Sequence, residues 1–434
     1  MKTKLFFLLI ILSILASCNL KGKKQSEGTK HHAEWVYNAT LYEVNIRQYT
    51  KEGTFSAFIN HIPRLKELGV DILWIMPVQP IGEKNRKGTL GSYYSIKNYT
   101  QINPEFGTLD DFKQLVAEAH NSGMKVILDW VANHTSFDAD WALEHKDWYA
   151  TDSLGQIVSP YDWTDVAKLN YGNSDMRKAM QDAMLFWLKE TNIDGFRCDV
   201  AGEVPTDFWE STVAELKKVK PDIFMLAEAE KPELNVKAFD AYYSWELFHQ
   251  MNEIAQGKAN VNALRETLKN RSKFPDYAIP MQFTSNHDEN SWNGTEFERM
   301  GNAAHPFTVL TYFLPGIPLI YSGQEVGFNH RLEFFEKDSI DWSDTGNFTA
   351  FYQTLINLKK ENNTLDCPEL GGKMDEITTS KPDEIFAFQR NIGDDKIIAI
   401  FNLSSNSVDF TIENDNLNIP SQMHLLPWEY KIVK

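Results

Sequence analysis

The sequence predicts an α/β fold: a (β/α)8 TIM barrel with a short domain B inserted after strand 3 and a C-terminal antiparallel β-sandwich domain. Three observations lead to this prediction. Short apolar runs alternate with amphipathic stretches of helical period along most of the chain, which is typical of a parallel α/β barrel. A stretch rich in Asp, Trp and Tyr without helical period, residues 135–171, interrupts the alternation. From Asp366 onward, short runs separated by Gly, Asn, Asp and Pro are typical of antiparallel strands.

The barrel strands are predicted from runs that are short, apolar and followed by polar or turn-forming residues. These runs are Leu41–Asn45, Asp71–Met76, Lys125–Asp129, Ile193–Asp199, Ile223–Glu228, Ala241–Ser244, Met281–Asn286 and Leu319–Ser322. Between them apolar residues recur at helical spacing. The predicted helices are Phe55–Leu68, Thr108–Ser122, Ser174–Thr191, Phe208–Lys218, Ala259–Asn270 and Gly301–Phe313, with Phe348–Lys360 closing the barrel.

The C-terminal segment has the alternation expected of strands in a small sandwich. Its predicted strands are Ile385–Arg390, Lys396–Asn402, Val408–Ile412 and Tyr430–Val433. The resulting domain limits are 35–134 and 172–362 for the barrel, 135–171 for domain B and 363–434 for the β-sandwich domain C. Residues 1–17 and 18–34 are predicted to be a signal peptide and a flexible tether.

The first residues read as an export signal. Lys2 and Lys4 precede the apolar run Leu5–Leu15, which is too short to span a bilayer as a stable helix. The following Leu15-Ala-Ser-Cys18 resembles a bacterial lipobox, in which the cysteine receives lipid, and Asn19 favours the outer membrane. We therefore expect an outer membrane lipoprotein anchored through Cys18 on the periplasmic or cell-surface side. An ordinary secretory signal with a chance cysteine is the alternative.

Composition limits the class of partner. The chain has 434 residues, 42% of them hydrophobic, which is ordinary for a globular protein. Its formal net charge of −17 argues against nucleic-acid binding, because neutralising phosphates requires a basic surface. We expect no nucleic-acid partner, and contact with a membrane only through the lipid anchor.

Polar residues at the carboxyl ends of predicted strands are candidates for catalysis, because a barrel builds its active site there. Side chains alternate along a strand, so Arg197 and Asp199 share one face while Phe196 and Cys198 share the other. If Phe196 and Cys198 pack outward against helices, Arg197 and Asp199 point into the barrel mouth. A guanidinium beside Asp199 keeps that carboxylate ionised, as a nucleophile requires.

A second carboxylate has a different environment. Glu228 follows the apolar run Phe224–Ala227, which could raise its pKa and suit it to act as a general acid. Glycoside cleavage needs such an unequal pair, because one carboxylate attacks and the other protonates the leaving oxygen. A lone acidic residue at a strand end is more often an N-cap or a surface group. Several acidic residues at the ends of predicted strands in one chain favour a catalytic role.

Five segments then carry a resemblance to a known family. They are Asp129-Trp-Val-Ala-Asn-His134, Gly195-Phe-Arg-Cys-Asp199, Glu228, Asn286-His-Asp288 and Gly316-Ile-Pro-Leu-Ile-Tyr-Ser-Gly-Gln-Glu325. In this order they resemble the motifs of the α-amylase family of glycoside hydrolases, from about Tyr37 to the C-terminus. Tyr94 aligns with the tyrosine that stacks on the sugar at subsite −1. The family's barrel, domain B and domain C agree with the layout predicted above.

The resemblance implies roles for individual residues. Asp199 would attack the anomeric carbon, and Glu228 would protonate the leaving oxygen and then deprotonate water. Asp288 would bind sugar hydroxyls and help distort the ring, Arg197 would orient Asp199, and His287, His134 and Tyr94 would complete subsite −1. The family retains anomeric configuration, which implies carboxyl groups about 5–5.5 Å apart. No cofactor is required for this chemistry.

At other positions the resemblance leaves more than one role open. Val200-Ala-Gly-Glu203 resembles the neopullulanase and cyclomaltodextrinase branch, which makes Glu203 a candidate substrate-binding residue. Asn133 matches an asparagine that ligates structural Ca2+ in many members. Domain B offers Asp138, Asp140, Asp162 and Asp165 as further oxygen ligands. Asn133 could equally serve as a hydrogen-bonding residue between domain B and the barrel.

Trp130, Trp163 and Trp292 lie near the motif loops and are candidates to stack on glucose.

The expected function is retaining hydrolysis of α-1,4-glucosidic bonds in starch, glycogen or maltooligosaccharides. The alternatives are cleavage of cyclodextrin or pullulan, and transglycosylation, in which a sugar instead of water intercepts the same intermediate. A non-catalytic glycan-binding lipoprotein is a third interpretation. The presence of Asp199, Glu228 and Asp288 argues against it.

Overall fold

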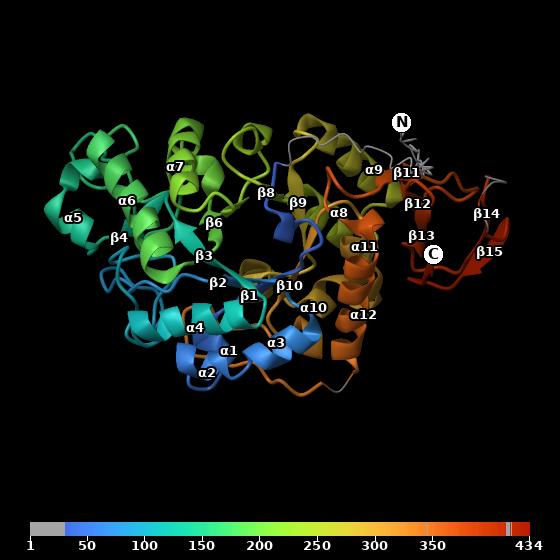
Figure 1. Ribbon diagram of the computed structural model, residues 1–434, viewed down its shortest axis with the longest axis horizontal. Helices are drawn as coiled ribbons and strands as arrows, with labels where there is room; N and C mark the ends of the chain where they lie inside the picture. The colour runs from blue at the N-terminus through green and yellow to red at the C-terminus, as the bar shows by residue number, and fades with distance from the viewer. Residues whose placement is uncertain (1–30, 345, 414–416, 418) are drawn as a thin grey trace, which may run out of the picture. The chain divides into compact units, whose positions relative to one another are not determined.

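The computed structural model describes residues 31–434 except 345, 414–416 and 418 (Figure 1). The predicted signal peptide, the proposed lipidation site Cys18 and most of the predicted tether lie outside the described residues. Within the described part of the chain, no helix combines the length and apolar character needed to cross a bilayer.

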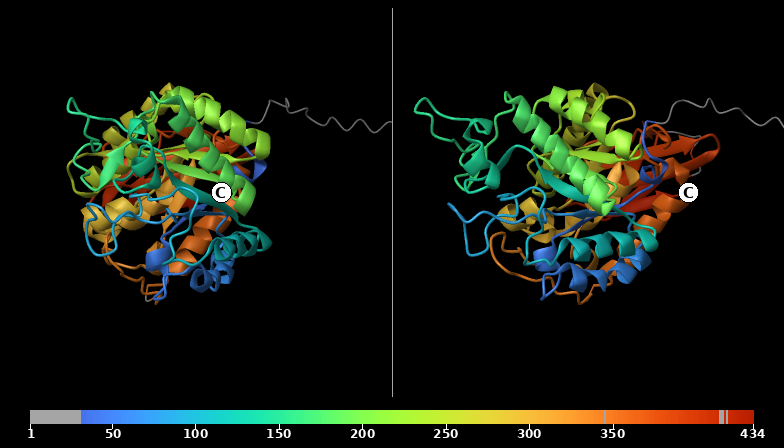
Figure 2. Two further views of the ribbon diagram at one scale, coloured as in Figure 1. Left: turned by 90° about the vertical axis from the view of Figure 1, so that its left-hand side faces the viewer. Right: turned by 60° about the vertical axis from the view of Figure 1, so that its left-hand side comes forward.

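Eight parallel strands of the described chain close into a barrel in the order β1-β10-β9-β8-β7-β6-β3-β2. The left view of Figure 2 shows helices arranged around these strands. The barrel strands are β1 (Leu41–Val44), β2 (Ile72–Ile75), β3 (Lys125–Val131), β6 (Gly195–Asp199), β7 (Phe224–Ala227), β8 (Ala241–Tyr243), β9 (Ile279–Gln282) and β10 (Ile317–Tyr321). The predicted barrel is confirmed.

All of the named predicted helices are present, whereas α1, α5, α8 and α10 were not named in the prediction. They are α1 (Ile46–Tyr49), α2 (Phe55–Ile59), α3 (Ile62–Leu68), α4 (Leu109–Asn121), α5 (Asp140–Glu144), α6 (Ser174–Thr191), α7 (Thr206–Val219), α8 (Trp245–Ala255), α9 (Val261–Asn270), α10 (Glu296–Met300), α11 (Ala304–Phe313) and α12 (Phe348–Glu361). Thr108 and Asp111 form a reciprocal capping box at the start of α4, and the Asn173 side chain caps α6.

Two predicted elements differ most from those observed. Phe55–Leu68 was expected as one helix but forms α2 and α3, because Pro63 suits the first turn of a helix and not its interior. The seventh strand was expected at Met281–Asn286 and instead is Ile279–Gln282. It therefore ends earlier, and leaves Ser285 and the whole Asn286-His-Asp288 motif beyond the end of the strand.

The excursion after β3 forms a small antiparallel pair, β4 (His134–Ser136) with β5 (Val166–Lys168). It is joined to the loop after β2, because Ser136 N–H donates to the Ile96 carbonyl at 2.8 Å. In Figure 1, α5 and β4 lie at the left, at the opposite end of the barrel from the C-terminal strands.

The C-terminal strands form two antiparallel sheets. The order β11 (Lys373–Glu376), β12 (Ile385–Ile392), β13 (Asp395–Asn402), β16 (Tyr430–Val433) makes one, and β14 (Val408–Thr411) with β15 (Gln422–Leu425) makes the other. Side chains of β12 alternate: Phe386 and Phe388 join the main core, whereas Ile385 and Ala387 join a separate core with the β14–β15 pair. The predicted antiparallel domain is confirmed.

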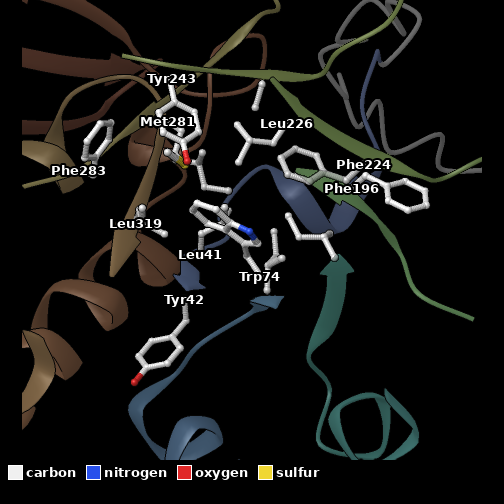
Figure 3. Close-up of a cluster of buried hydrophobic side chains, with 14 of the residues drawn as sticks. Leu41, Tyr42, Trp74, Phe196, Phe224, Leu226, Tyr243, Met281, Phe283 and Leu319 are labelled. Carbon is white, nitrogen blue, oxygen red and sulfur yellow. The ribbon is translucent and has the colours of Figure 1, made fainter. Parts of the chain in front are cut away.

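The barrel interior is filled by large side chains from neighbouring strands, among which Trp74 and Tyr243 are fully buried. Figure 3 shows Trp74 within this cluster, with Leu41, Leu319 and Tyr243 around it. The Trp74 indole N–H donates to Asp129 at 3.0 Å. This ring therefore joins the apolar core to the polar groups above it.

His31 and His32 belong to the segment predicted as a flexible tether, yet they contact the barrel. His32 is 8% exposed, and its ring nitrogens lie 2.8 Å from Asp240 Oδ1 and 2.7 Å from the Tyr277 carbonyl oxygen. His31 stacks on the Tyr277 ring with centroids 4.0 Å apart. Asp240 directly precedes β8, so this attachment lies at the amino ends of the barrel strands.

Candidate active site

A cavity of about 530 Å³ opens at the carboxyl ends of the barrel strands. It is lined by residues from the ends of β6, β7 and β9, the loops after β2 and β10, and the excursion after β3. The lining residues are Lys87, Ser92, Tyr94, His134, Trp163, Asp165, Val166, Asp199, Val200, Glu228, His287, Asp288, Trp292, Phe334 and Phe335. The sequence-predicted residues Tyr94, His134, Asp199, Glu228, His287 and Asp288 are thus brought together in one site.

Arg197 lies buried beneath the residues that line this cavity and contacts three carboxylates. Its Nη1 lies 2.9 Å from Asp129 Oδ1 and 3.3 Å from Asp199 Oδ1. Its Nη2 lies 2.9 Å from Glu228 Oε2, a close ion pair without hydrogen-bond alignment. Its Nε donates to the Tyr243 hydroxyl at 3.2 Å. A fully buried guanidinium therefore fixes both catalytic candidates relative to each other.

The outward-facing residues of β6 pack as expected from strand alternation. Phe196 lies edge-on to Trp130 with centroids 5.5 Å apart, and Cys198 is completely buried. Trp130 is itself fully buried, so it is a core residue and the candidate stacking role on glucose is wrong. Trp163 and Trp292 do line the cavity.

The turn after Asp199 is strained in a way that serves the site. Val200 adopts φ 35°, in the left-handed region that branched residues rarely occupy. In this conformation the Val200 N–H donates to Glu228 Oε2 at 2.8 Å. The backbone next to Asp199 therefore holds the Glu228 carboxylate in place.

The two carboxylates do not have the simple electrostatics expected from the sequence. We expected Arg197 to keep Asp199 ionised, but the guanidinium is shared with Asp129 and Glu228. Burial and the neighbouring charge of Glu228 raise the pKa of Asp199, against the effect of Arg197. Burial also raises the pKa of Glu228, again opposed by Arg197. Because burial raises the pKa of both neighbouring carboxyl groups, they titrate as a pair and can hold one shared proton.

A chain of hydrogen bonds supports the opposite wall. His287 Nδ1 lies 2.5 Å from Glu43 Oε1, and His287 Nε2 lies 2.8 Å from the Tyr94 hydroxyl. The Tyr94 hydroxyl is also 3.0 Å from Asp129 Oδ2. Burial lowers the pKa of His287, but the charges of Asp288 and Glu43 outweigh this and raise it to about 9. A charged His287 therefore donates to Glu43 and Tyr94, and Tyr94 donates to Asp129.

His134 differs from His287 in charge. It is buried, and burial lowers its pKa to about 3, so its imidazole is neutral at pH 7. Its ring lies edge-on to Trp163 with centroids 5.7 Å apart. A neutral ring in the cavity wall can exchange hydrogen bonds with an uncharged sugar.

Glu203 does not line the cavity. It is exposed on the short turn after β6, where it accepts a hydrogen bond from Tyr161 of the excursion. Glu203 therefore does not lie where it could contact the sugar at the bond that is cleaved.

The calcium hypothesis at Asn133 depends on which oxygen atoms near it are free to bind a cation. Asn133 is buried, with its amide nitrogen 3.3 Å from His134 Nδ1. The candidate partners have other contacts: Asp140 accepts from Asn98 at 2.6 Å, and Asp165 pairs with Lys87 at 3.0 Å. Within the described chain, no three His, Cys, Asp or Glu side chains are grouped to hold a metal ion. Two of the four candidate carboxylates thus already have partners, and a calcium site at Asn133 stays a prediction.

Several residues of the site were not assigned by the sequence analysis. Glu43 is the clearest case, although a single charged residue inside the apolar run of β1 was a usable signal. Asp129 belonged to a recognised motif, but its place beneath Arg197 depends on the β3–β6 pairing, where Asp129 lies opposite Arg197. Trp74 and Tyr243 looked like ordinary core residues.

Comparisons with known proteins agree with this geometry. The sequence matches the family described as alpha amylase, catalytic domain, over residues 24–153 and 144–395. It is 26% identical over 397 residues to Alpha-amylase MalA of Haloarcula japonica, covering 86% of this chain and 56% of that protein. It is 27% identical over 381 residues to a Cyclomaltodextrinase of a Bacillus species, covering 81% of this chain and 65% of that protein. The chain thus spans between about half and two thirds of the length of these relatives.

The solved structure of an alpha-amylase from Lactobacillus plantarum is similar with a TM-score of 0.82 at 31% identity. The match covers 91% of this chain and 98% of that one.

Proposed function

Because this chain belongs to the alpha-amylase family, we propose that it is a retaining hydrolase of α-1,4-glucosidic bonds in starch, glycogen or maltooligosaccharides. The single observation that carries this proposal is the shared guanidinium of Arg197, which contacts Asp199 at 3.3 Å and Glu228 at 2.9 Å beneath one cavity. Two carboxyl groups held around one fixed cation can divide the roles of nucleophile and acid.

The reaction begins with the shared proton on Glu228. Asp199 attacks the anomeric carbon while Glu228 donates that proton to the glycosidic oxygen, so the bond to the leaving sugar breaks as the bond to Asp199 forms. Glu228 then takes a proton from water, and the oxygen of that water displaces Asp199. Two displacements at the same carbon retain its configuration.

Other lining residues hold the sugar during these steps. Asp288 presents carboxylate oxygens that can accept hydrogen bonds from ring hydroxyls. Its Oδ2 lies 3.3 Å from His287 Nε2, so the charged ring of His287, whose two N–H groups donate to Glu43 and Tyr94, holds this carboxylate in place. Tyr94 supplies an aromatic face, and its stacking with the His287 ring at 5.3 Å keeps that face in place. These contacts orient the ring for attack by Asp199.

A product profile tests this proposal. Purified protein beginning at Lys21 would receive starch, pullulan, cyclodextrin and maltoheptaose, with Glu228→Gln as the control. We expect short maltooligosaccharides from starch and their loss in the variant. If no α-glucan is turned over in a Glu228-dependent way, the substrate assignment is wrong and a glycan-binding role gains support.

Cleavage of cyclodextrin or pullulan is the second candidate function. It is favoured by the Ala201–Glu203 turn and by the 27% identity to a Cyclomaltodextrinase. Preference for cyclodextrin in the same assay, or panose from pullulan, would select it. Transglycosylation would appear as products longer than the maltoheptaose supplied.

We also propose that the mature protein is tethered to the outer membrane through a lipid on Cys18. The basic start, apolar run and Leu15-Ala-Ser-Cys18 segment support this proposal. Radiolabelled palmitate should enter the full-length protein and not a Cys18→Ala variant. Equal labelling of the two would contradict the anchor.

A further inference from the structure

We propose that the Lys87–Asp165 ion pair closes the non-reducing side of the cavity, so that the enzyme recognises free chain ends and releases one short product. Lys87 Nζ lies 3.0 Å from Asp165 Oδ1 across the cavity wall. The inference rests on the proposed hydrolase function and adds the direction and mode of attack on the chain.

The barrel order sets the direction of the bound chain. Glu228 and Val200 follow β7 and β6, and the leaving sugar must pass Glu228 to receive its proton. The loops after β2 and β10 flank β1 in the strand order, on the other side of the barrel mouth from β6 and β7. The non-reducing part of the substrate therefore extends toward the loop after β2, where Lys87 lies.

That loop is fastened on both flanks. Toward the loop after β10, Leu90 N–H donates to the Phe335 carbonyl at 3.0 Å, and Thr89 N–H donates to Glu336 Oε1 at 2.8 Å. Toward the excursion, Ser95 Oγ donates to the Asp165 carbonyl at 3.2 Å. The loop that carries Lys87 is thus held from both sides, which fixes the ion pair at the side of the cavity away from Glu228.

The chemistry of Lys87 suits the end of a glucan chain. Among the described residues that line the cavity, it is the only lysine or arginine, and its side chain is 39% exposed whereas that of Asp165 is 8% exposed. An ammonium group has three donors, and Asp165 occupies one of them. The others can bind the free 4-hydroxyl that a glucan carries only at its non-reducing end. If the chain continued with another glucose on its 4-oxygen, that glucose would occupy the space of the Lys87–Asp165 ion pair and would have to separate the two side chains.

The test compares maltoheptaose with the same oligosaccharide carrying a 4,6-O-ethylidene group on its non-reducing glucose. Because loss of a hydrogen bond to a charged group costs about tenfold in binding, we expect kcat/KM to be at least about tenfold lower for the blocked substrate. Equal rates on the two would overturn the inference and leave the hydrolase proposal standing. Absence of turnover on either would instead overturn the hydrolase proposal.

Substitutions test whether Lys87 causes the preference for the unblocked substrate. In Lys87→Met the preference for the unblocked substrate should fall severalfold and products of mixed length should appear, whereas Lys87→Arg should keep the preference. Lys84→Met is the matched control, because Lys84 lies in the same loop, is exposed and does not line the cavity. Asp165→Asn provides a second test of the pair should Lys87→Met fold poorly. An unchanged preference in folded Lys87→Met and Asp165→Asn would overturn the assignment.

Discussion

The contact between Glu43 and His287 gives a prediction whose size follows from the structure. Both side chains are buried, and His287 Nδ1 lies 2.5 Å from Glu43 Oε1. The pKa of His287 rises from 6.5 to about 9, which corresponds to roughly 3 kcal/mol in favour of the charged ring in the folded protein. Asp288 supplies part of this effect. Glu43→Gln should therefore lower the free energy of unfolding by about 2 kcal/mol at neutral pH.

The sign of the pH dependence follows from the raised pKa. Folding favours the charged ring, so the added stability is fully present below the unfolded pKa of 6.5 and is lost as the pH rises through about 9. The difference between wild type and Glu43→Gln should be largest below about pH 6.5, still large at neutral pH, and smaller above pH 9. Urea denaturation followed by tryptophan fluorescence measures it.

Glu325→Gln is the matched control. Glu325 is also fully buried, but its partner is Arg64 at 2.9 Å, which does not lose its charge in this range. Its substitution should destabilise the protein by an amount that does not change across the same pH interval. If Glu43→Gln behaved like Glu325→Gln, the charged state assigned to His287 would be wrong.

Three further predictions concern the site and the thiols. Arg197→Met should lower the free energy of unfolding by about 3–5 kcal/mol in urea and abolish turnover, because Asp129 and Glu228 lose their buried cation. Glu228→Gln should reduce kcat on maltoheptaose by about 10²–10⁴. It should also remove the alkaline limb of the pH profile, which reflects the burial-raised pKa of Glu228. Cys198 and Cys367 are buried free thiols whose pKa burial raises, so neither should react with a thiol reagent until urea unfolds the protein.

The barrel could be predicted because the pattern of a short apolar strand followed by an amphipathic helix is repeated along the chain. Apolar runs and helical periods recur along the chain, and each agrees with the next, so single errors do not change the topology. By contrast, β11 (Lys373–Glu376) and β15 (Gln422–Leu425) were missed. Both are short, and polar residues occupy three of the four positions of β11 and two of the four of β15, because each pairs with only one neighbouring strand of its sheet. Short polar edge strands resemble loops in sequence.

The part of the candidate site that could be predicted consists of polar residues at the carboxyl ends of predicted strands. Asp199, Glu228 and Asp288 were found in this way, and the structure brings them to one cavity. The sharing of Arg197 among three carboxylates could not be found, because it depends on β3, β6 and β7 being neighbours. Contact between Lys87 and Asp165 is likewise set by two loops that are far apart in the sequence.

The central claim is that Asp199 forms a covalent bond to the sugar. A 5-fluoro-α-glucosyl fluoride slows the second displacement more than the first, so the intermediate accumulates and can be located by peptide mass spectrometry. The account predicts one glycosylated peptide that contains Asp199, and no labelling in Asp199→Asn. A label on Glu228 or Asp288 instead, with Asp199 unmodified, would contradict it.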